Sequence, residues 1–411
     1  MEYIAALDLG TSKMLAMVAS KNDRQEILAT EQIESGNSIR RGLIHSTTEV
    51  SSKIVELIRR LNQTLKQKNL PELKQVYVSI GGQGLHTETC SIERNIDGNI
   101  VDDSVLEDLR NECRSDWSDS PFELDDIISP EYYLDGHLES QPQGVRCKKL
   151  KARFQLVLGH FPDFKTEVKR ALQKVSVELT NTFVAPLATA EAVLTEAEKE
   201  NGCALVEWGA GVTYLSIYDS GLLRHLAAIP IGGEVITKDI CSLNKEIEAE
   251  GWKISEGCAC SNAESNELNN VIEARVDEIV DNILHQIKNS NYGQTLNAGF
   301  VLTGGASRLN GLDKLLEQRS DKPVRRVKDN PEQSCVRGLL QLGNENCAKE
   351  EKIKQSSRVE RILGNLFETE IQPKTKETKA KKEKAPSESI IKKVGRKASE
   401  ATEKAAKGLF D

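Results

Sequence analysis

What the chain lacks narrows the class of protein. No run of residues approaches the ~18 consecutive apolar positions that a membrane-spanning helix needs. The nine cysteines include no Cys-x-x-Cys pair, which argues against a disulfide scaffold and against a structural zinc site. The opening stretch MEYIAALDLG has no basic segment ahead of an apolar one, so it predicts a folded strand in place of a signal peptide. These absences together favour a protein of the reducing cytoplasm.

Charge is distributed unevenly along the 411 residues. The formal net charge is −8, but from residue 349 onward 17 Lys and Arg stand against 11 Asp and Glu, which leaves a balance of −14 for residues 1–348. An acidic body with a basic tail is not the pattern of a nucleic-acid-binding protein, so we expect no nucleic-acid partner. The pattern is typical of a globular protein with an arm for something anionic.

Hydrophobic periodicity predicts a mixed α/β protein. Residues 83–160 are polar and irregular, with one acidic helix (102–114) and strands near 90–96 and 150–158, and they are interpreted as an insert of separate character. The other expected elements are a hairpin (3–9 and 14–19), a helix (49–68), a strand (76–82), two helices (163–175 and 185–199), a second hairpin (203–218), two short helices after it, a long helix (266–289) and a strand, glycine turn and helix over 298–318.

Two of the predicted hairpin loops have the composition of a phosphate cradle. They are Gly10-Thr11-Ser12 and Gly209-Ala210-Gly211-Val212-Thr213, and each follows a strand that carries a carboxylate, Asp8 or Glu207. Two such loops facing each other can hold a polyphosphate between their backbone N–H groups, and the carboxylates suit Mg²⁺. A third loop, Gly304-Gly305, opens a helix where a ligand can approach the backbone. Each loop by itself is also explained as a tight turn that needs glycine, so the prediction of a nucleotide site depends on the set.

The order and spacing of these motifs resemble the FtsA family of actin-like ATPases, over about residues 3–342. DLGTSK and VEWGAGVTYLSIY are similar to its two phosphate loops, and VLTGGASRLNGL is similar to its adenosine motif. IPIGGEVITKDI and AEGWKISEGCA resemble segments with ribose and adenine contacts. The resemblance implies a two-lobed actin-like (ribonuclease H-like) α/β fold with ATP and Mg²⁺ as ligands. The nucleotide-binding residues that it implies are Asp8, Gly10, Thr11, Ser12, Lys13, Glu207, Gly209, Gly211, Val212, Thr213, Gly233, Glu250, Lys253, Gly304 and Gly305, with Asp8 and Glu207 facing Mg²⁺ through water.

The same resemblance implies a domain plan. The stretch YYLDGHLESQPQGVRCKKLKARFQLVLG lies within the segment where the FtsA family carries its inserted subdomain. The expected parts are lobe 1 (1–82 and 161–200), the inserted subdomain (83–160), lobe 2 (201–235 and 298–344), a small subdomain of lobe 2 (236–297), a disordered linker (345–388) and a terminal amphipathic helix (389–411).

The second phosphate loop departs from the family pattern Asp-x-Gly-Gly-Gly-Thr-Thr-Asp. Glu207 replaces the first Asp, Ala210 and Val212 replace a Gly and a Thr, and Tyr214 replaces the last Asp. Glu is one methylene longer than Asp, and a misplacement of about 1 Å can cost ~100-fold in rate. We therefore expect ATP to bind while its hydrolysis is weak or absent. The alternative, in which Glu207 acts adequately in place of Asp as the catalytic group, stays open.

The C-terminal arm has the pattern of an interfacial membrane helix. At roughly 100° per residue, Ile391, Val394 and Leu409 fall on one side together with three alanines, and lysines spread over the other. An earlier segment, 357–371, is a rival anchor with larger apolar side chains. The terminal helix is preferred because the family resemblance places the anchor there. Its expected membrane residues are Ile390, Ile391, Lys392, Lys393, Val394, Arg396, Lys397, Leu409 and Phe410.

The resemblance implies a function at the cell-division septum. The expected protein binds ATP, self-assembles, and tethers the C-terminal tail of the tubulin-like FtsZ to anionic lipids on the cytoplasmic face of the inner membrane, with the insert contacting other division proteins. Two alternatives share the superfamily. One is a small-molecule kinase, for which no obvious catalytic base is found, and the other is a pilus-type actin homologue, which normally lacks a long linker and terminal anchor.

Overall fold

The computed structural model describes residues 2–21, 25–118, 120–161, 163–243 and 267–347. The predicted linker from residue 348 onward and the predicted terminal helix lie outside the described residues. So does the second of the two short helices predicted after the second hairpin. None of the described helices is long and apolar enough to cross a membrane.

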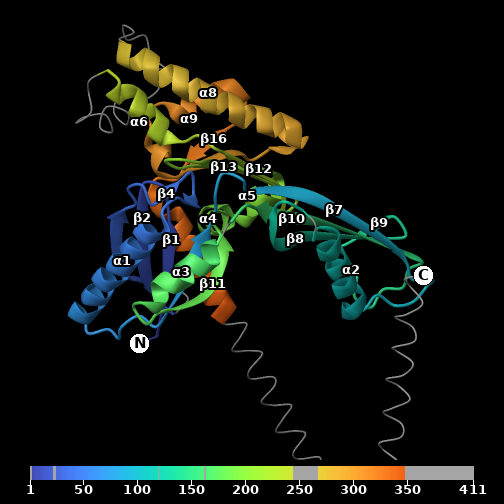
Figure 1. Ribbon diagram of the computed structural model, residues 1–411. Coiled ribbons are helices and arrows are strands. Elements are labelled where there is room, and N and C mark those ends of the chain that lie inside the picture. Colours follow the sequence, from blue (N-terminus) through green and yellow to red (C-terminus); the bar gives the residue numbers. More distant parts are fainter. Residues whose placement is uncertain (1, 22–24, 119, 162, 244–266, 348–411) are drawn as a thin grey trace, which may run out of the picture. The chain divides into compact units, whose positions relative to one another are not determined.

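Lobe 1 is built on a five-stranded sheet in the order β11-β6-β1-β2-β3. Figure 1 shows β1 and β2 of this sheet beside α1. The predicted first hairpin is confirmed, because β1 and β2 pair antiparallel from Tyr3–Ser20 to Leu9–Met14. Strand β6 lies parallel to β1 on its other side. The strands are β1 (Tyr3–Leu9), β2 (Lys13–Ser20), β3 (Ile27–Glu34), β6 (Gln75–Ile80) and β11 (Glu178–Val184), and a separate small hairpin is formed by β4 (Ile39–Arg40) and β5 (Leu43–Ile44).

Lobe 2 belongs to a nine-stranded sheet in the order β16-β15-β12-β13-β14-β7-β10-β8-β9. Its first five strands repeat the connectivity of lobe 1: a central antiparallel hairpin is flanked by a third antiparallel strand on one side and by two parallel strands on the other. The strands of lobe 2 are β12 (Cys203–Trp208), β13 (Thr213–Asp219), β14 (Leu222–Ile229), β15 (Gly299–Thr303) and β16 (Val324–Arg326). Two α/β lobes on one plan confirm the predicted two-lobed architecture.

Helices cover both faces of the lobe 1 sheet, so the side chains on both faces of its central strands are buried. Ala5, Leu7 and Leu9 pack on one face with α1 (Thr47–Gln67) and α3 (Phe164–Gln173). Ile4 and Ala6 face the other way, toward α4 (Ala185–Val193) and a helix over residues 334–347. This alternation is the two-residue period of a strand. It places Asp8 on the same face as Ala6, toward α4 and the 334–347 helix.

The remaining helices pack mainly around lobe 2. Long helix α8 (Glu267–Ser290) confirms the prediction for 266–289, and it packs with α6 (Gly233–Cys241) and α9 (Leu312–Ser320) over one face of β12 and β13.

The expected helix 185–199 is two helices, α4 and α5 (Glu196–Asn201). The chain breaks at Leu194 because Thr195 starts α5 with a capping box to Glu198. Short 3-10 turns occupy Gly293–Thr295, Gly305–Arg308 and Pro331–Gln333.

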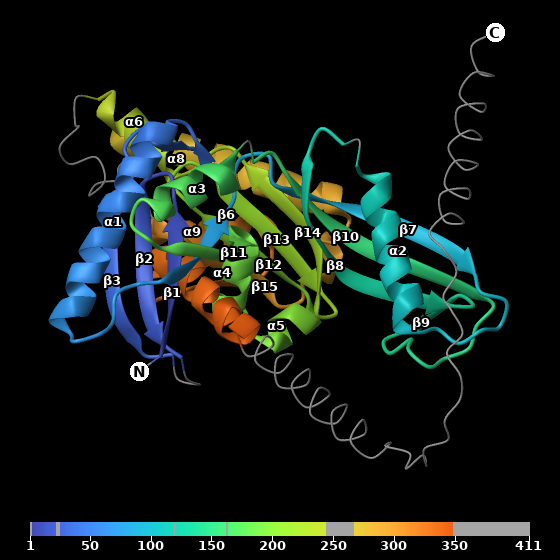
Figure 2. The same cartoon turned by 60° about the horizontal axis from the view of Figure 1, so that its bottom comes forward.

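The inserted segment forms its own small unit and also extends the lobe 2 sheet. Helix α2 (Asp103–Asp116) packs on β7 (His86–Asn95), β8 (Glu123–Leu134) and β10 (Lys149–Gly159), with β9 (His137–Glu139) at the edge. Figure 2 shows these strands continuing the sheet beyond β14, where Ala227 pairs with His86. Strand β8 was not predicted, because ELDDIISPEYYL is polar and only Ile127, Glu131 and Leu134 are buried.

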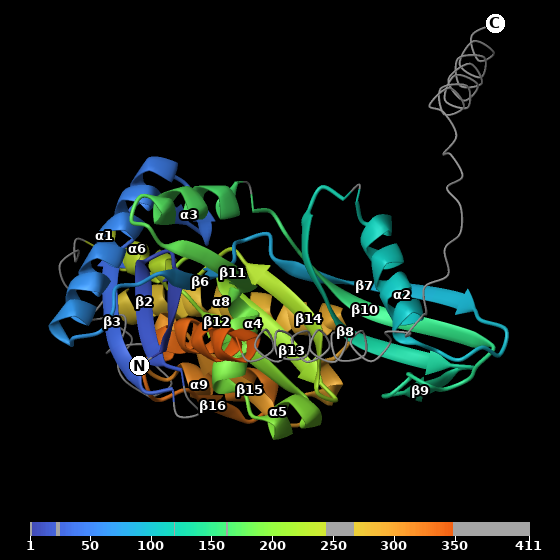
Figure 3. The ribbon, with the colours of Figure 1, turned by 90° about the horizontal axis from the view of Figure 1, so that it is seen from below.

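The 334–347 helix approaches α4 so closely that one position accepts only glycine. It is the last helix among the described residues (Figure 3) and passes the predicted linker start at residue 345. A Cβ built on Gly338 would lie 1.7 Å from the carbonyl oxygen of Ala188. That atom belongs to the backbone of a buried helix, so it cannot move aside cheaply.

Gly338→Ala is therefore expected to destabilise the protein by about 3 kcal/mol. Helix propensity alone predicts the opposite sign, a gain of about 1 kcal/mol. Urea unfolding followed by circular dichroism measures the difference. Glu345→Ala on the same helix, at an exposed position, is the control and should change little. A Gly338→Ala protein as stable as the parent would show that the two helices are not in this contact.

Candidate functional site

The first glycine loop is held from outside by the segment that follows β3. The Ser35 hydroxyl donates to the Gly10 carbonyl (2.7 Å), and the Ser35 N–H donates to the Ser12 carbonyl (2.9 Å). The Gly42 N–H, at the tip of the β4–β5 hairpin, donates to Thr11 Oγ1 (3.1 Å). These bonds occupy carbonyl and hydroxyl oxygens and leave the backbone N–H groups of Thr11 and Ser12 without a hydrogen bond to another described residue.

The second loop is held by the start of α6 and by the third loop. The Gly233 N–H donates to the Gly209 carbonyl (2.9 Å), and the Glu234 N–H donates to the Ala210 carbonyl (2.8 Å). Gly304 packs so closely that a Cβ there would lie 2.5 Å from the Trp208 carbonyl oxygen. Gly304 has a φ of +87°, which favours glycine for a second reason. The second and third glycine loops predicted from the sequence therefore meet.

The first and second loops face each other directly. A Cβ on Gly211 would lie 2.8 Å from both Cγ2 and Oγ1 of Thr11 and 3.2 Å from the Arg41 N atom. The Gly211 N–H, like those of Thr11 and Ser12, makes no hydrogen bond to another described residue. Unpaired N–H groups on two opposed glycine loops are the arrangement that binds an anion.

Two carboxylates lie at the base of these loops. The Asp8 carboxylate accepts a hydrogen bond from the Ser79 hydroxyl (2.6 Å), and Ser79 also accepts from the Leu9 N–H (3.2 Å). Burial raises the pKa of Asp8, against the opposing effects of Ser79 and Lys13 among other groups. Burial and then the Asp8 charge raise the pKa of Glu207 to about 8. Its Oε2 atom is buried and has no hydrogen-bond partner among the described residues.

This donor set fits Mg²⁺ held through water. An orphaned carboxylate oxygen beside a second carboxylate has an unmet demand for positive charge, and Mg²⁺ needs few protein oxygens because it keeps most of its waters. Among the described residues no group of three or more His, Cys, Asp or Glu side chains is placed to hold a metal by itself. The two carboxylates therefore suit a metal that arrives with a phosphate ligand.

Other predicted site residues occupy varied positions. Lys13 lies close enough to Asp8 to lower its pKa, and Ser12 is exposed. Val212 is part of the core, and the fully buried Thr213 donates its hydroxyl to the Ile231 carbonyl (2.8 Å). Gly305 begins the 3-10 turn after β15. Outside the described residues lie Glu250, Lys253, the rival anchor 357–371 and every expected membrane residue.

Three residues near the carboxylates were not expected from the sequence. Ser79 lies 71 positions from Asp8. Thr189 on α4 opposes the raised pKa of Glu207, and the buried Cys335 lies beside Asp8. None of the three belongs to a local motif. The only signal for Ser79 is its place in VYVSIGG, just before a glycine pair.

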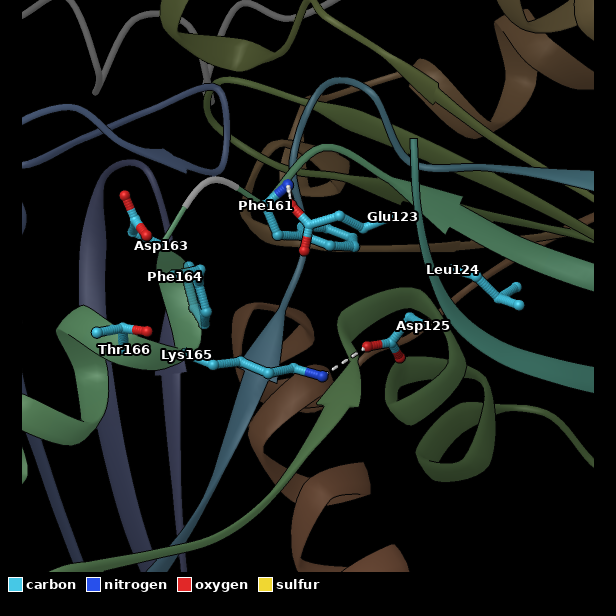
Figure 4. Close-up of a pocket in the computed structure, with 8 residues that line it drawn as sticks. All are labelled: Glu123, Leu124, Asp125, Phe161, Asp163, Phe164, Lys165 and Thr166. Carbon is cyan, nitrogen blue, oxygen red and sulfur yellow. Dashed lines mark hydrogen bonds and ion pairs between the residues drawn. The ribbon is translucent and has the colours of Figure 1, made fainter. Parts of the chain in front are cut away.

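Two pockets lie away from the glycine loops and contain none of the predicted nucleotide residues. One, of about 460 Å³, lies between the start of β8 and the start of α3 (Figure 4). There the Lys165 Nζ contacts Asp125 Oδ1 (3.1 Å), and Glu123 accepts a hydrogen bond from the Phe161 N–H (3.2 Å). The other, of about 590 Å³, lies where β7 meets β14 and includes His86 and His225.

Comparison with solved structures places the fold. The structure resembles a chain of the PilM-PilN type IV pilus biogenesis complex at 15% identity, with a TM-score of 0.60 over 83% of this chain and 98% of that one. It also resembles MreB5 of Spiroplasma citri, solved bound to ADP, at 14% identity and a TM-score of 0.50, over 85% and 99% of the two chains. At these identities the likeness shows the fold alone, and that fold is actin-like.

Comparison of sequences identifies the family. The family model described as cell division protein FtsA matches residues 204–339. The cell division protein FtsA of Porphyromonas gingivalis is 30% identical over 332 residues, which cover 74% of this chain and 68% of that protein. The protein of the same name from Bacillus subtilis is 25% identical over 378 residues, 84% of each. With the two actin-like lobes and their opposed glycine loops, these matches show that the chain belongs to the FtsA family of cell division proteins.

Proposed function

We propose that the chain binds ATP with Mg²⁺ between its two lobes and acts as a membrane-attached scaffold of cell division. The observation that carries the nucleotide part is the pair of opposed loops with unpaired N–H groups above the carboxylates of Asp8 and Glu207. The N–H groups of Thr11, Ser12 and Gly211 would bind the phosphates, and the carboxylates would orient the waters of Mg²⁺, which neutralises phosphate charge when bound. The similar fold of MreB5, which was solved bound to ADP, supports the same use of the fold.

Gly211→Ala is expected to reduce ATP affinity at least ~30-fold, because the added methyl group would collide with Thr11 and displace the two phosphate loops. Binding of a fluorescent ATP analogue, with and without Mg²⁺, measures the effect. Gly84→Ala is the control, since a Cβ there meets nothing closer than 3.7 Å. If Gly211→Ala binds ATP like the parent protein, the phosphates do not lie between these loops.

Hydrolysis is proposed to be slow because Glu207 places its carboxylate one methylene beyond the position that Asp reaches. Glu207→Asp is expected to raise the rate of phosphate release at least ~10-fold if the shorter side chain restores the position of the attacking water. A malachite-green assay under saturating ATP measures both proteins. A parent rate well above background, unchanged by Glu207→Asp, would mean that Glu207 serves adequately in place of Asp.

The scaffold part of the proposal concerns attachment and assembly. We infer that the terminal helix 389–411 binds anionic lipids at the cytoplasmic face of the inner membrane, that the chain self-associates, and that the small subdomain 236–297 binds the FtsZ C-terminal tail at the septum. Each Lys or Arg near an anionic surface contributes about 1 kcal/mol, and the alanine-rich apolar face adds little. Assembly would therefore strengthen attachment by presenting many arms at once.

Co-sedimentation with anionic vesicles in the presence of ATP tests the attachment. The full chain should pellet with the vesicles, and a chain ending at residue 388 should not. If both pellet equally, and a vesicle-free control shows no polymer, the segment 357–371 is the anchor. If neither pellets, the chain is not a membrane tether.

Retention on beads carrying an FtsZ-tail peptide tests the partner. A superfamily kinase or a pilus-type homologue would not be retained. The inserted subdomain is proposed to contact other division proteins, and the pocket between β8 and α3 is a candidate part of that surface because three carboxylates, Glu123, Asp125 and Asp163, line it.

A further inference from the structure

Tyr214 connects the two lobes behind the phosphate loops. Its hydroxyl comes from β13 of lobe 2 and accepts a hydrogen bond from the Gly82 N–H of lobe 1 (2.7 Å). The residue is only 9% exposed. This buried hydrogen bond joins the two sheets beside the phosphate loops, whereas Arg325 of lobe 2 joins Glu198 and Val193 elsewhere.

Three glycines of lobe 1 form a cradle for this hydroxyl. A Cβ on Gly81 would lie 2.6 Å from Tyr214 Oη, and a Cβ on Gly42 would lie 3.1 Å from it. Gly82 supplies the N–H donor. Any side chain at Gly81 would collide with Tyr214 Oη. Glycine at this position therefore leaves space for the tyrosine hydroxyl.

The cradle is linked to both phosphate loops. On the lobe 1 side, the Gly42 N–H donates to Thr11 Oγ1 in the first loop. On the lobe 2 side, Tyr214 directly follows the second loop and pairs across the strands with Glu207. These contacts therefore connect Thr11 of the first loop, through Gly42 and Tyr214, to Glu207 at the base of the second loop.

We propose that Tyr214 is a positioning residue whose hydroxyl holds the two loops at the separation that binds the phosphates. The nucleotide part rests on the ATP site proposed above, whereas the link between the lobes does not. Without the hydroxyl, the Gly82 N–H loses its acceptor and the lobes are free to part at this point. Nucleotide should then dissociate faster, because the phosphates would be bound firmly by one loop only and no longer by both.

Amide hydrogen exchange tests the link without nucleotide. Tyr214→Phe removes one oxygen and keeps the ring, so the Gly82 amide should exchange roughly five- to tenfold faster, the size expected for loss of one buried hydrogen bond. Tyr218→Phe is the matched control, because Tyr218 lies on the same strand, is 8% exposed, and does not reach these glycines. Equal exchange at Gly82 in both variants would overturn the proposal.

A double-mutant cycle with Gly81→Ala tests the cradle. The added methyl group collides with the Tyr214 oxygen, but in Tyr214→Phe its nearest ring atom is Cζ at 3.4 Å, an ordinary contact. Gly81→Ala should therefore speed Gly82 exchange at least fivefold in the parent and have little further effect in Tyr214→Phe. The same fold-change in both backgrounds would show that the hydroxyl does not occupy the cradle.

Nucleotide dissociation tests the positioning role. Tyr214→Phe should release a fluorescent ATP analogue ~10-fold faster than the parent, and Tyr218→Phe should match the parent. Unchanged release from Tyr214→Phe would overturn the positioning role. If no protein in the set binds ATP while the exchange results follow expectation, the proposed ATP site is wrong and the link between the lobes stands.

Discussion

Glu207→Gln is expected to stabilise the protein, free of nucleotide and metal, by about 3 kcal/mol at pH 7. Burial, and then the nearby Asp8 charge, raise the pKa of Glu207 from 4.5 to about 8. A folded-state pKa above the unfolded value means that the folded state favours the protonated acid. The contribution of the Glu207 carboxyl to the free energy of unfolding is therefore fully present below pH 4.5, and it is lost as the pH rises toward 8. Glutamine cannot ionise, so the variant avoids this loss.

Urea unfolding in EDTA at pH 5, 6, 7 and 8 measures the effect. The gain from Glu207→Gln should be small at pH 5 and should grow up to pH 8. Glu198→Gln is a control of opposite sign: although burial opposes it, hydrogen bonds from Arg325 and Thr195 lower the pKa of Glu198, so this variant should lose stability above pH 4.5. If Glu207→Gln is less stable than the parent at pH 7, the folded protein does not raise the pKa of Glu207.

Glu131→Ala is expected to destabilise the protein by about 3 to 5 kcal/mol. Glu131 lies on β8 of the insert and contacts Arg224 on β14 of lobe 2 (2.8 Å), with only 8% and 10% of the two side chains exposed. Arg153 lies 3.8 Å from the same carboxylate. Removal of Glu131 leaves the Arg224 guanidinium buried with Asp219 as its nearest carboxylate, at 4.0 Å. The joint between the insert and lobe 2 should therefore loosen.

Urea unfolding and the rate of proteolysis within residues 86–159 measure this loosening. Glu93→Ala is the matched control, because Glu93 is also on a strand of the insert and pairs with Lys149 at 2.8 Å, yet both side chains are more than half exposed. Exposed pairs contribute little because water and salt screen them. If Glu131→Ala is tolerated as well as Glu93→Ala, the insert is not fastened to lobe 2 through this pair.

For the insert, the sequence predicted the segment but not the strand to which it attaches. The insert itself was predicted, because its polar and irregular composition differs from that of its surroundings and the family resemblance places an inserted subdomain there. Its partner was not, because the β7–β14 joint brings together residues far apart in the chain, such as Ala227 and His86, about 140 positions apart. No local pattern encodes which edge of a distant sheet a strand will extend.

In the candidate site, too, some features were predicted from the sequence and others were seen only in the structure. Glycine, hydroxyl and carboxylate spacing predicted the loops, because turn chemistry acts within a few residues. It did not predict Ser79 beside Asp8, or that the Thr213 hydroxyl would bond inward to Ile231. The sequence also marked Tyr214 as a departure from the family pattern without indicating what the tyrosine contacts.

The sequence by itself determined the α/β class, the hairpin loops, helices such as α1 and α8, and the family, because periodicity, turn residues and motif order are local properties of the chain. Only the tertiary structure decided that the lobes share one strand plan, that the insert extends the sheet of lobe 2, and that Tyr214 occupies a cradle of lobe 1 glycines. Those outcomes depend on which buried surfaces and hydrogen-bonding groups meet across long stretches of chain. A polar group that is buried without a hydrogen-bond partner costs stability, and the residue that becomes its partner is set by the tertiary structure and not by the local sequence.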